Sequence, residues 1–278
     1  MVSFDLNQLY GWMTAFIWPF LRLLALMGTA PLLSDSAIPV RVKVGFAALT
    51  AIAIAPALGP MPPIAPASFA GLWIAVQQVL IGIALGLTMR IVFAAVETAG
   101  DFIGLQMGLS FASFFDPSMG PNTTVLSRLM TIVATLFFLA LNGHLLMLAG
   151  LVRTFEVMPI GMDSLNSGGW GVLLDWSKQV MVSGLLLALP VIIALLTINL
   201  AMGILNRTAQ QLSVFAVGFP ISLLVGLILL AIVLPQTGPF LTHLFQSGYD
   251  AMGRLAQAMA GLPGSPIMSR QPLWLPYR

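Results

Sequence analysis

Two side chains in the sequence could together perform nucleophilic chemistry, those of Ser110 and His144. A serine nucleophile needs a histidine base within hydrogen-bond reach and donors for the oxyanion. Ser110 lies in the pattern Gly108–Phe111, which is weak as a motif, and the surrounding sequence suggests no oxyanion donors. His144 directly follows Asn142-Gly143, and we expect it to be a polar residue at a helix end with its hydrogen bonds satisfied, rather than a proton carrier. An intramembrane serine hydrolase therefore ranks lowest among the alternatives, and we expect a protein that is not an enzyme.

The other titratable residues do not predict a metal or cofactor site. Cysteine is absent, the two histidines are His144 and His243, and HExxH-type spacing does not occur. Arg22, Glu97 and Asp101 lie in or beside apolar runs. A charge at such depth indicates a partner group, a wet cavity or, near a helix end, snorkelling. Secondary transporters carry such charges as well, but they also need polar substrate ligands at mid-membrane, and this sequence has few.

Composition indicates that the elements positioning these residues are membrane helices. Hydrophobic residues make up 59% of the 278-residue chain and charged residues only 7%, whereas soluble domains have roughly a quarter charged. The formal net charge of +2 gives no reason to expect nucleic acid as a partner. The predicted fold class is all-α, a polytopic membrane protein of about six long, kinked apolar helices with a C-terminal amphipathic helix.

The predicted spans are the apolar runs 11–30, 44–58, 69–96, 125–152, 180–205 and 212–234. Pro190 and Pro220 should kink the last two. The charged segment after residue 152, with the SGGWG run at 167–171, is expected to be a loop, and residues 206–211 a short turn. Residues 237–262 have apolar side chains at helical spacing and predict an amphipathic helix that lies on a surface or packs on a partner.

The same patterns suggest a domain organisation and a topology. We expect residues 1–261 to form one integral membrane domain, and residues 262–278 to be disordered or foreign to the native protein. Lys and Arg gather slightly more on one set of connections, and basic residues mark the cytoplasmic side. This bias predicts that both termini are outside and that residues 100–124 enter from the cytoplasmic side.

The stretch Gly100–Thr124 resembles neither of the apolar segments that flank it. Small residues recur at intervals of four, and the centre holds three phenylalanines in five residues, Phe111, Phe114 and Phe115. Asp116-Pro117 then ends any helix. An ordinary cytoplasmic loop is the simplest interpretation, yet a solvated loop has no need of so much apolar surface. Met and Phe side chains can seal a passage, because they fill irregular space and exclude water.

Small residues also predict close helix packing. Gly82 and Gly86 form a GxxxG pair in a long apolar run, a pattern that is common by chance. Gly100, Gly104, Gly108 and Ala112 would form one smooth stripe on a helix, against which another backbone could lie.

Three ordered motifs together resemble the FliR family of flagellar export-gate proteins. They are QMGLSFASFFDP at 106–117, FLALNGHLLMLAGL at 138–151 followed by PIG at 159–161, and NRTAQQLSVFAVGFPISLLVG at 206–226. The resemblance covers roughly residues 5–260, and the tail lies outside it. Gln210 departs from the family pattern, which commonly has proline before glutamine, so the turn there should be built differently.

The resemblance implies a subunit of the pore that exports unfolded flagellar proteins, in the bacterial inner membrane at the flagellar basal body. It implies a helical hetero-oligomeric assembly with FliP-like and FliQ-like subunits, an FlhB-like subunit and an FlhA-like ring, in contact with membrane lipid. The family's plug loop corresponds to Met107, Phe111, Phe114, Phe115 and Asp116. Gly218 and Pro220 would break a helix to fit neighbouring elements, and a virulence secretion system is the alternative host.

Overall fold

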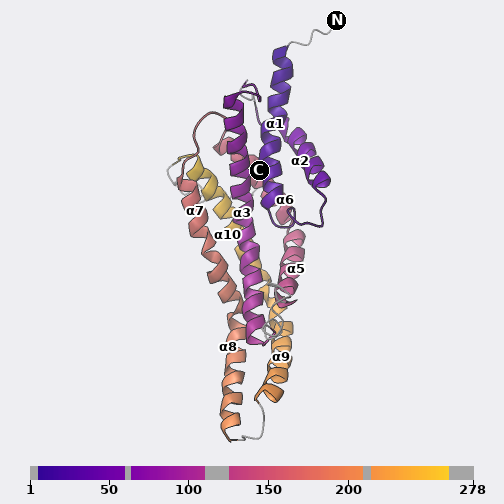
Figure 1. Cartoon of the computed structure of the whole chain (residues 1–278), viewed down its shortest axis with the longest axis vertical. Helices are drawn as coiled ribbons and strands as arrows, with labels where there is room; N and C mark the ends of the chain where they lie inside the picture. The colour runs from indigo at the N-terminus through magenta and orange to yellow at the C-terminus, as the bar shows by residue number, and fades with distance from the viewer. Residues whose placement is uncertain (1–5, 60–63, 110–124, 209–213, 263–278) are drawn as a thin grey trace. The chain divides into compact units, whose positions relative to one another are not determined.

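The computed structural model describes residues 6–59, 64–109, 125–208 and 214–262, and they are helical with short connections (Figure 1). The described helices, in chain order, are α1 (Leu6–Thr29), α2 (Val40–Ile54), η1 (Ala55–Ala57), α3 (Phe69–Gln106), α5 (Val125–Ala140), α6 (Gly143–Val157), α7 (Gly168–Ser177), α8 (Gln179–Thr208), α9 (Val214–Val233), η3 (Leu234–Thr237) and α10 (Gly238–Met259). The prediction of an all-α fold is confirmed.

Among the described residues, four stretches are long and apolar enough to cross a membrane. They are Val40–Ala57, Phe69–Gln106, Gly168–Leu205 and Gly218–Met259. The pair α5 and α6 would make a fifth if it counts as one broken span, and α1 contains a shorter apolar helix, Met13–Thr29. These counts are compatible with the predicted set of about six apolar helices.

The chain divides into two compact units. Unit 1 comprises Met1–Arg90, Asn142–Ser177 and Gln246–Arg278, and unit 2 comprises Ile91–Leu141 and Lys178–Phe245. Helices α3 and α10 contribute residues to both units. In unit 1, α2 packs beside α1 (Figure 1), and the Tyr249 hydroxyl of α10 donates a hydrogen bond to the Gly143 carbonyl oxygen of α6 at 3.0 Å.

Unit 2 has an aromatic centre. The rings of Phe93 and Phe138 meet edge to face at 5.4 Å between centroids, and those of Phe138 and Phe245 do so at 5.3 Å. These rings come from α3, α5 and the first part of α10, so one cluster joins three helices. Helices α8 and α9 lie side by side in the same unit (Figure 1), and the Ser222 hydroxyl donates to Asn199 Oδ1 at 2.8 Å.

Several predicted boundaries were wrong. Helix α3 continues ten residues past residue 96, to Gln106. The predicted span 125–152 is two helices, because Asn142 adopts a left-handed conformation with φ of 55°. An Asn-Gly pair accepts that conformation more readily than most sequences do.

The predicted helix break at Gly218 and Pro220 and the predicted loop after residue 152 also differ from the structure. Helix α9 runs unbroken from Val214 to Val233 through Pro220, so Gly218 and Pro220 do not break it. The run at 167–171 belongs mostly to α7. A Cβ on Gly169 would lie 2.2 Å from Met259 Cγ, so the glycine lets α7 dock closely on α10. This packing outweighs the poor helix propensity of glycine.

The C-terminal amphipathic helix is present as α10, and its apolar side is covered by the rest of the chain. Leu244 and Phe245 are buried in its first part, and Leu255 and Met259 in its last part. Helix α10 is therefore a packed helix of this chain.

Candidate functional site

The first part of the stretch Gly100–Thr124 is helical and ends at a defined cap. Gly108 has φ of 79°, and its amide donates to the Leu105 carbonyl oxygen at 3.1 Å. The Leu109 amide donates to the Gly104 carbonyl oxygen at 3.0 Å. These two bonds form a Schellman motif, which commonly uses a glycine with positive φ to end a helix. Of the predicted small-residue stripe, Gly100 and Gly104 lie in α3 and Gly108 terminates that helix, while Ala112 lies outside the described residues.

Met107, one of the predicted plug residues, lies at this helix end and is only 1% exposed. Its side chain covers Gly226 of α9, where a Cβ would lie 2.6 Å from Met107 Cγ and 2.8 Å from its Sδ. A side chain at position 226 would force the methionine to move. The chain therefore leaves α3 from a point that is anchored on α9, within unit 2.

The chain returns to α3 where α5 begins. A Cβ on Gly100 would lie 2.5 Å from the Ser127 Cα, so the two helices touch backbone to backbone. The Ser127 hydroxyl donates to the Asp101 carboxylate and lies 3.1 Å from the Glu97 carbonyl oxygen. Both described ends of the stretch are thus held on the last turns of α3, and Asp101 has a polar partner there.

The remaining predicted plug residues, Phe111, Phe114, Phe115 and Asp116, lie outside the described residues. Ser110 lies outside them as well, so the proposed pairing of Ser110 with His144 is untested. His144 lies in the first turn of α6, and its buried Nδ1 atom has no hydrogen-bond partner among the described residues, so the expectation of a fully satisfied side chain there was wrong. Within the described ranges, no group of three His, Asp or Glu side chains is arranged to hold a metal ion.

Arg22 forms a second polar cluster, inside unit 1, and its side chain is fully buried. Its Nε donates to Gln78 Oε1 at 2.8 Å, its Nη1 to Thr154 Oγ1 at 2.9 Å and its Nη2 to the Met158 carbonyl oxygen at 3.2 Å. The guanidinium carbon lies 3.9 Å from the centre of the Phe155 ring. All of these partners are electrically neutral.

The position of this guanidinium explains how a buried cation is tolerated. Met158 is the C-terminal cap of α6, so its carbonyl has no partner within the helix. The negative end of the helix dipole lies there, and a cation is favourable at that point. Arg22 therefore satisfies the end of α6 and ties it to α1 and α3.

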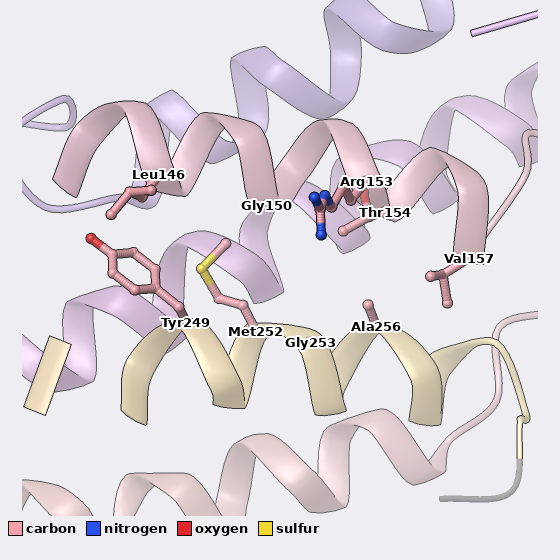
Figure 2. Close-up of a pocket in the computed structure, with 9 residues that line it drawn as sticks. All are labelled: Leu146, Gly150, Arg153, Thr154, Val157, Tyr249, Met252, Gly253 and Ala256. Atoms are coloured by element: carbon pink, nitrogen blue, oxygen red, sulfur yellow. The ribbon is translucent and has the colours of Figure 1, made fainter. Parts of the chain in front are cut away.

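A small pocket lies between α6 and α10, also within unit 1 (Figure 2). Three small residues leave the gap between the helices: Gly150 of α6, and Gly253 and Ala256 of α10. The pocket is also lined by Arg153 and Tyr249. Its cavity volume is about 10 Å³, which is room for about one water molecule. The pocket is too small to be a substrate site.

The GxxxG pair lies against α1 in unit 1. A Cβ on Gly82 would lie 2.3 Å from the Arg22 carbonyl oxygen, and one on Gly86 would lie 2.9 Å from the Ala30 amide nitrogen. The missing side chains let the backbones of α1 and α3 approach closely. This contact also brings Arg22 within reach of Gln78, one turn before Gly82.

Sequence reasoning singled out Arg22 but missed its partners. Gln78 could have been found, because a polar residue inside an apolar helix needs a partner. Thr154 and the Met158 carbonyl gave no such signal, since threonine often bonds to its own helix and any carbonyl can accept. Ser127, which holds one end of the central stretch, was missed for the same reason, and Gly226 at the other end was missed because a glycine does not indicate which residue packs on it.

Comparisons with known proteins identify the relatives of this chain. The family model described as bacterial export proteins, family 1, matches residues 13–248. The flagellar biosynthetic protein FliR of Escherichia coli strain K12 is 49% identical over 263 residues, which cover 95% of this chain and 99% of that protein. FliR of Pectobacterium carotovorum is 46% identical, covering 91% and 96%, and FliR of Bacillus subtilis is 28% identical, covering 90% and 97%.

The fold and these matches define the class as an all-helical protein of the bacterial export family 1, with helices of membrane-spanning character. Within that class, the chain belongs to the FliR family.

Proposed function

We propose that this protein is a subunit of the flagellar export apparatus and that the plug residues of the stretch Gly100–Thr124, which are Met107, Phe111, Phe114, Phe115 and Asp116, close the passage for exported proteins. It acts as a structural and transport component, without catalysis. Family membership supports the export role, because the relatives named above are flagellar biosynthetic proteins. Their flagellar naming also favours a flagellum over a virulence secretion system as the host.

The observation that carries the closing role is the anchoring of both ends of the segment. Met107 is buried over Gly226 at one end, and Ser127 is bonded to the end of α3 at the other. An apolar segment that is fixed at both ends can occupy a passage and stay in place while a protein is exported through it. Between those points, Phe111, Phe114 and Phe115 supply the bulky side chains that exclude water and ions.

The test is the triple variant Phe111→Ala, Phe114→Ala and Phe115→Ala in the assembled complex. We expect assembly to be kept and the membrane to become leaky to ions and small molecules. The matched control is Phe69→Ala with Leu72→Ala, which removes large side chains that are 86% and 60% exposed at the start of α3. An assembled triple variant with the conductance of the wild type would refute the closing role.

Partner subunits are proposed from the surface of the described helices. Helix α8 exposes large apolar side chains along its length, from Met181, 61% exposed, to Ile204, 62% exposed. A surface of this kind needs lipid or other protein to cover it. We assign it to FliP-like and FliQ-like subunits in the bacterial inner membrane, with an FlhB-like subunit and an FlhA-like ring nearby.

Affinity purification of the tagged chain in mild detergent, followed by mass spectrometry, tests these partners. Co-purification of FliP-like and FliQ-like proteins is expected. Recovery of the chain alone, from cells that express those proteins, would overturn the assembly and favour a transporter.

A further inference from the structure

Helix α10 carries a polar stripe, which consists of His243, Gln246, Asp250 and Arg254. These residues follow one another at intervals of three and four, so they lie on one face of the helix. Because α10 is one unbroken helix, their register follows from that helix alone. His243, Gln246 and Arg254 are exposed, and Asp250 is half-buried. None of the large apolar side chains of α10 is exposed.

The chain itself covers the other sides of α10. In unit 2, Phe245 packs on the aromatic rings of α3 and α5, with ring centroids 5.8 Å and 5.3 Å away. In unit 1, Tyr249 is hydrogen-bonded to α6, and Met259 lies against the glycine of α7 that lets that helix dock. The polar stripe is therefore the side of α10 that the described part of the chain leaves open.

The neighbouring helix α5 exposes side chains of the opposite kind. Its Phe138 ring touches Phe245 of α10, and two residues earlier Leu136 is 62% exposed. His243 lies two residues before Phe245 and is exposed as well. An exposed apolar side chain needs lipid or other protein to cover it, whereas a charge or an amide needs water or a polar partner. At this level of unit 2, the surface of α5 therefore requires an apolar cover and the surface of α10 a polar one.

We propose that the polar stripe faces the water-filled passage of the export apparatus and contacts the unfolded polypeptide during export. Lipid or an apolar helix against the stripe would remove water from the charges of Asp250 and Arg254, at a high cost. With its histidine neutral, the stripe has one positive and one negative charge, so it attracts neither sign strongly and suits polypeptides of varied composition. The proposal deepens the proposed function, since it rests on the chain being part of the export apparatus.

Contact with water is tested with single cysteines, because the sequence contains none of its own. Gln246→Cys and Arg254→Cys are compared with Leu136→Cys and Leu200→Cys, whose positions are 62% and 67% exposed on α5 and α8. Each variant, assembled in open membrane fragments, is treated with a charged maleimide. We expect the stripe cysteines to react about tenfold faster or more, because the reactive thiolate forms in water. Equal rates at the four positions, or slower reaction in the stripe, would overturn the proposal.

Contact with the exported polypeptide is tested with an export substrate fused to a domain that cannot unfold, so that the substrate stalls in the passage. The photo-crosslinking residue p-benzoylphenylalanine at position 246 or 254 should cross-link to this substrate, and the same residue at position 136 or 200 should not. Cross-links from the stripe to a partner subunit, or no cross-link to a substrate that co-purifies with the complex, would overturn the polar stripe alone. A substrate that never co-purifies with the complex would instead overturn the proposed export function, and this proposal with it.

Discussion

Replacing Gln78 should expose how much the protein relies on neutral groups to hold the buried Arg22 cation. Gln78→Leu removes the acceptor for Arg22 Nε, which lies 2.8 Å away, and keeps a side chain of similar size. Hydrogen bonds to charged groups contribute about 1.5–3 kcal/mol, and a buried charged donor left without a partner is at the upper end. We therefore expect the free energy of unfolding to fall by about 3 kcal/mol.

The neighbouring residue supplies a matched control. Gln77 is also a glutamine of α3, and its Nε2 donates to the Asp163 carbonyl oxygen at 2.7 Å. This bond is neutral and Asp163 is exposed, so water can replace the lost donor. Gln77→Leu should cost no more than about 1 kcal/mol.

The measurement is thermal unfolding of the detergent-purified protein, followed by the fluorescence of its six tryptophans. With about 2–4 °C per kcal/mol for a chain of this size class, Gln78→Leu should lower Tm by about 6–12 °C and Gln77→Leu by at most about 4 °C. Equal losses for the two variants would refute the argument.

A double-mutant cycle then separates the charge from simple packing. Adding Arg22→Met to Gln78→Leu removes the cation whose donor was left without a partner. The double variant should be no less stable than Gln78→Leu alone, with a coupling energy of about 2 kcal/mol, inside the range seen for contacting residues. Additive losses would show that Arg22 and Gln78 act independently.

Two further substitutions test helix packing. Gly82→Ala places a Cβ 2.3 Å from the Arg22 backbone and should lower the free energy of unfolding by about 1–3 kcal/mol in the same assay. The control Gly203→Ala in α8, where a Cβ would have nothing within 4 Å, should raise it by about 0.5–1 kcal/mol. A stabilising Gly82→Ala would contradict the close contact of α1 with α3. Phe138→Ala removes a ring from the aromatic centre of unit 2 and should lower the free energy of unfolding by about 3–5 kcal/mol. The control Leu136→Ala, at a 62% exposed position, should lower it by less than about 1 kcal/mol. Similar losses for the two variants would refute the role of that centre.

Some of the fold could be predicted because it depends on local pattern. Long apolar runs predicted α1, α3, α8 and α9. The apolar spacing after residue 237 predicted α10, because residues three and four apart share one face of a helix. These signals come from neighbouring residues, so they do not depend on how distant segments meet.

The errors arose where distant contacts outweigh local preference. Helix α7 forms over a glycine-rich run because Gly169 docks against Met259, far along the chain. The break at Asn142 and the end of α3 at Gly108 depend on positive φ angles, which Asn-Gly and glycine permit but do not require. Local sequence could therefore suggest these positions without deciding between a turn and a continued helix.

The sequence by itself determined the class of this protein. Its apolar composition predicts helices of membrane-spanning character, and its ordered motifs indicate the FliR family, as the comparisons established. Only the tertiary structure decided which residues hold the ends of the central stretch and the buried cation. Met107 packs on Gly226, Ser127 bonds to Asp101, and Arg22 bonds to the end of α6. Local sequence does not specify these pairs, because an apolar side chain can pack against any surface of matching shape and a buried polar group bonds to whichever acceptor the packing brings near it.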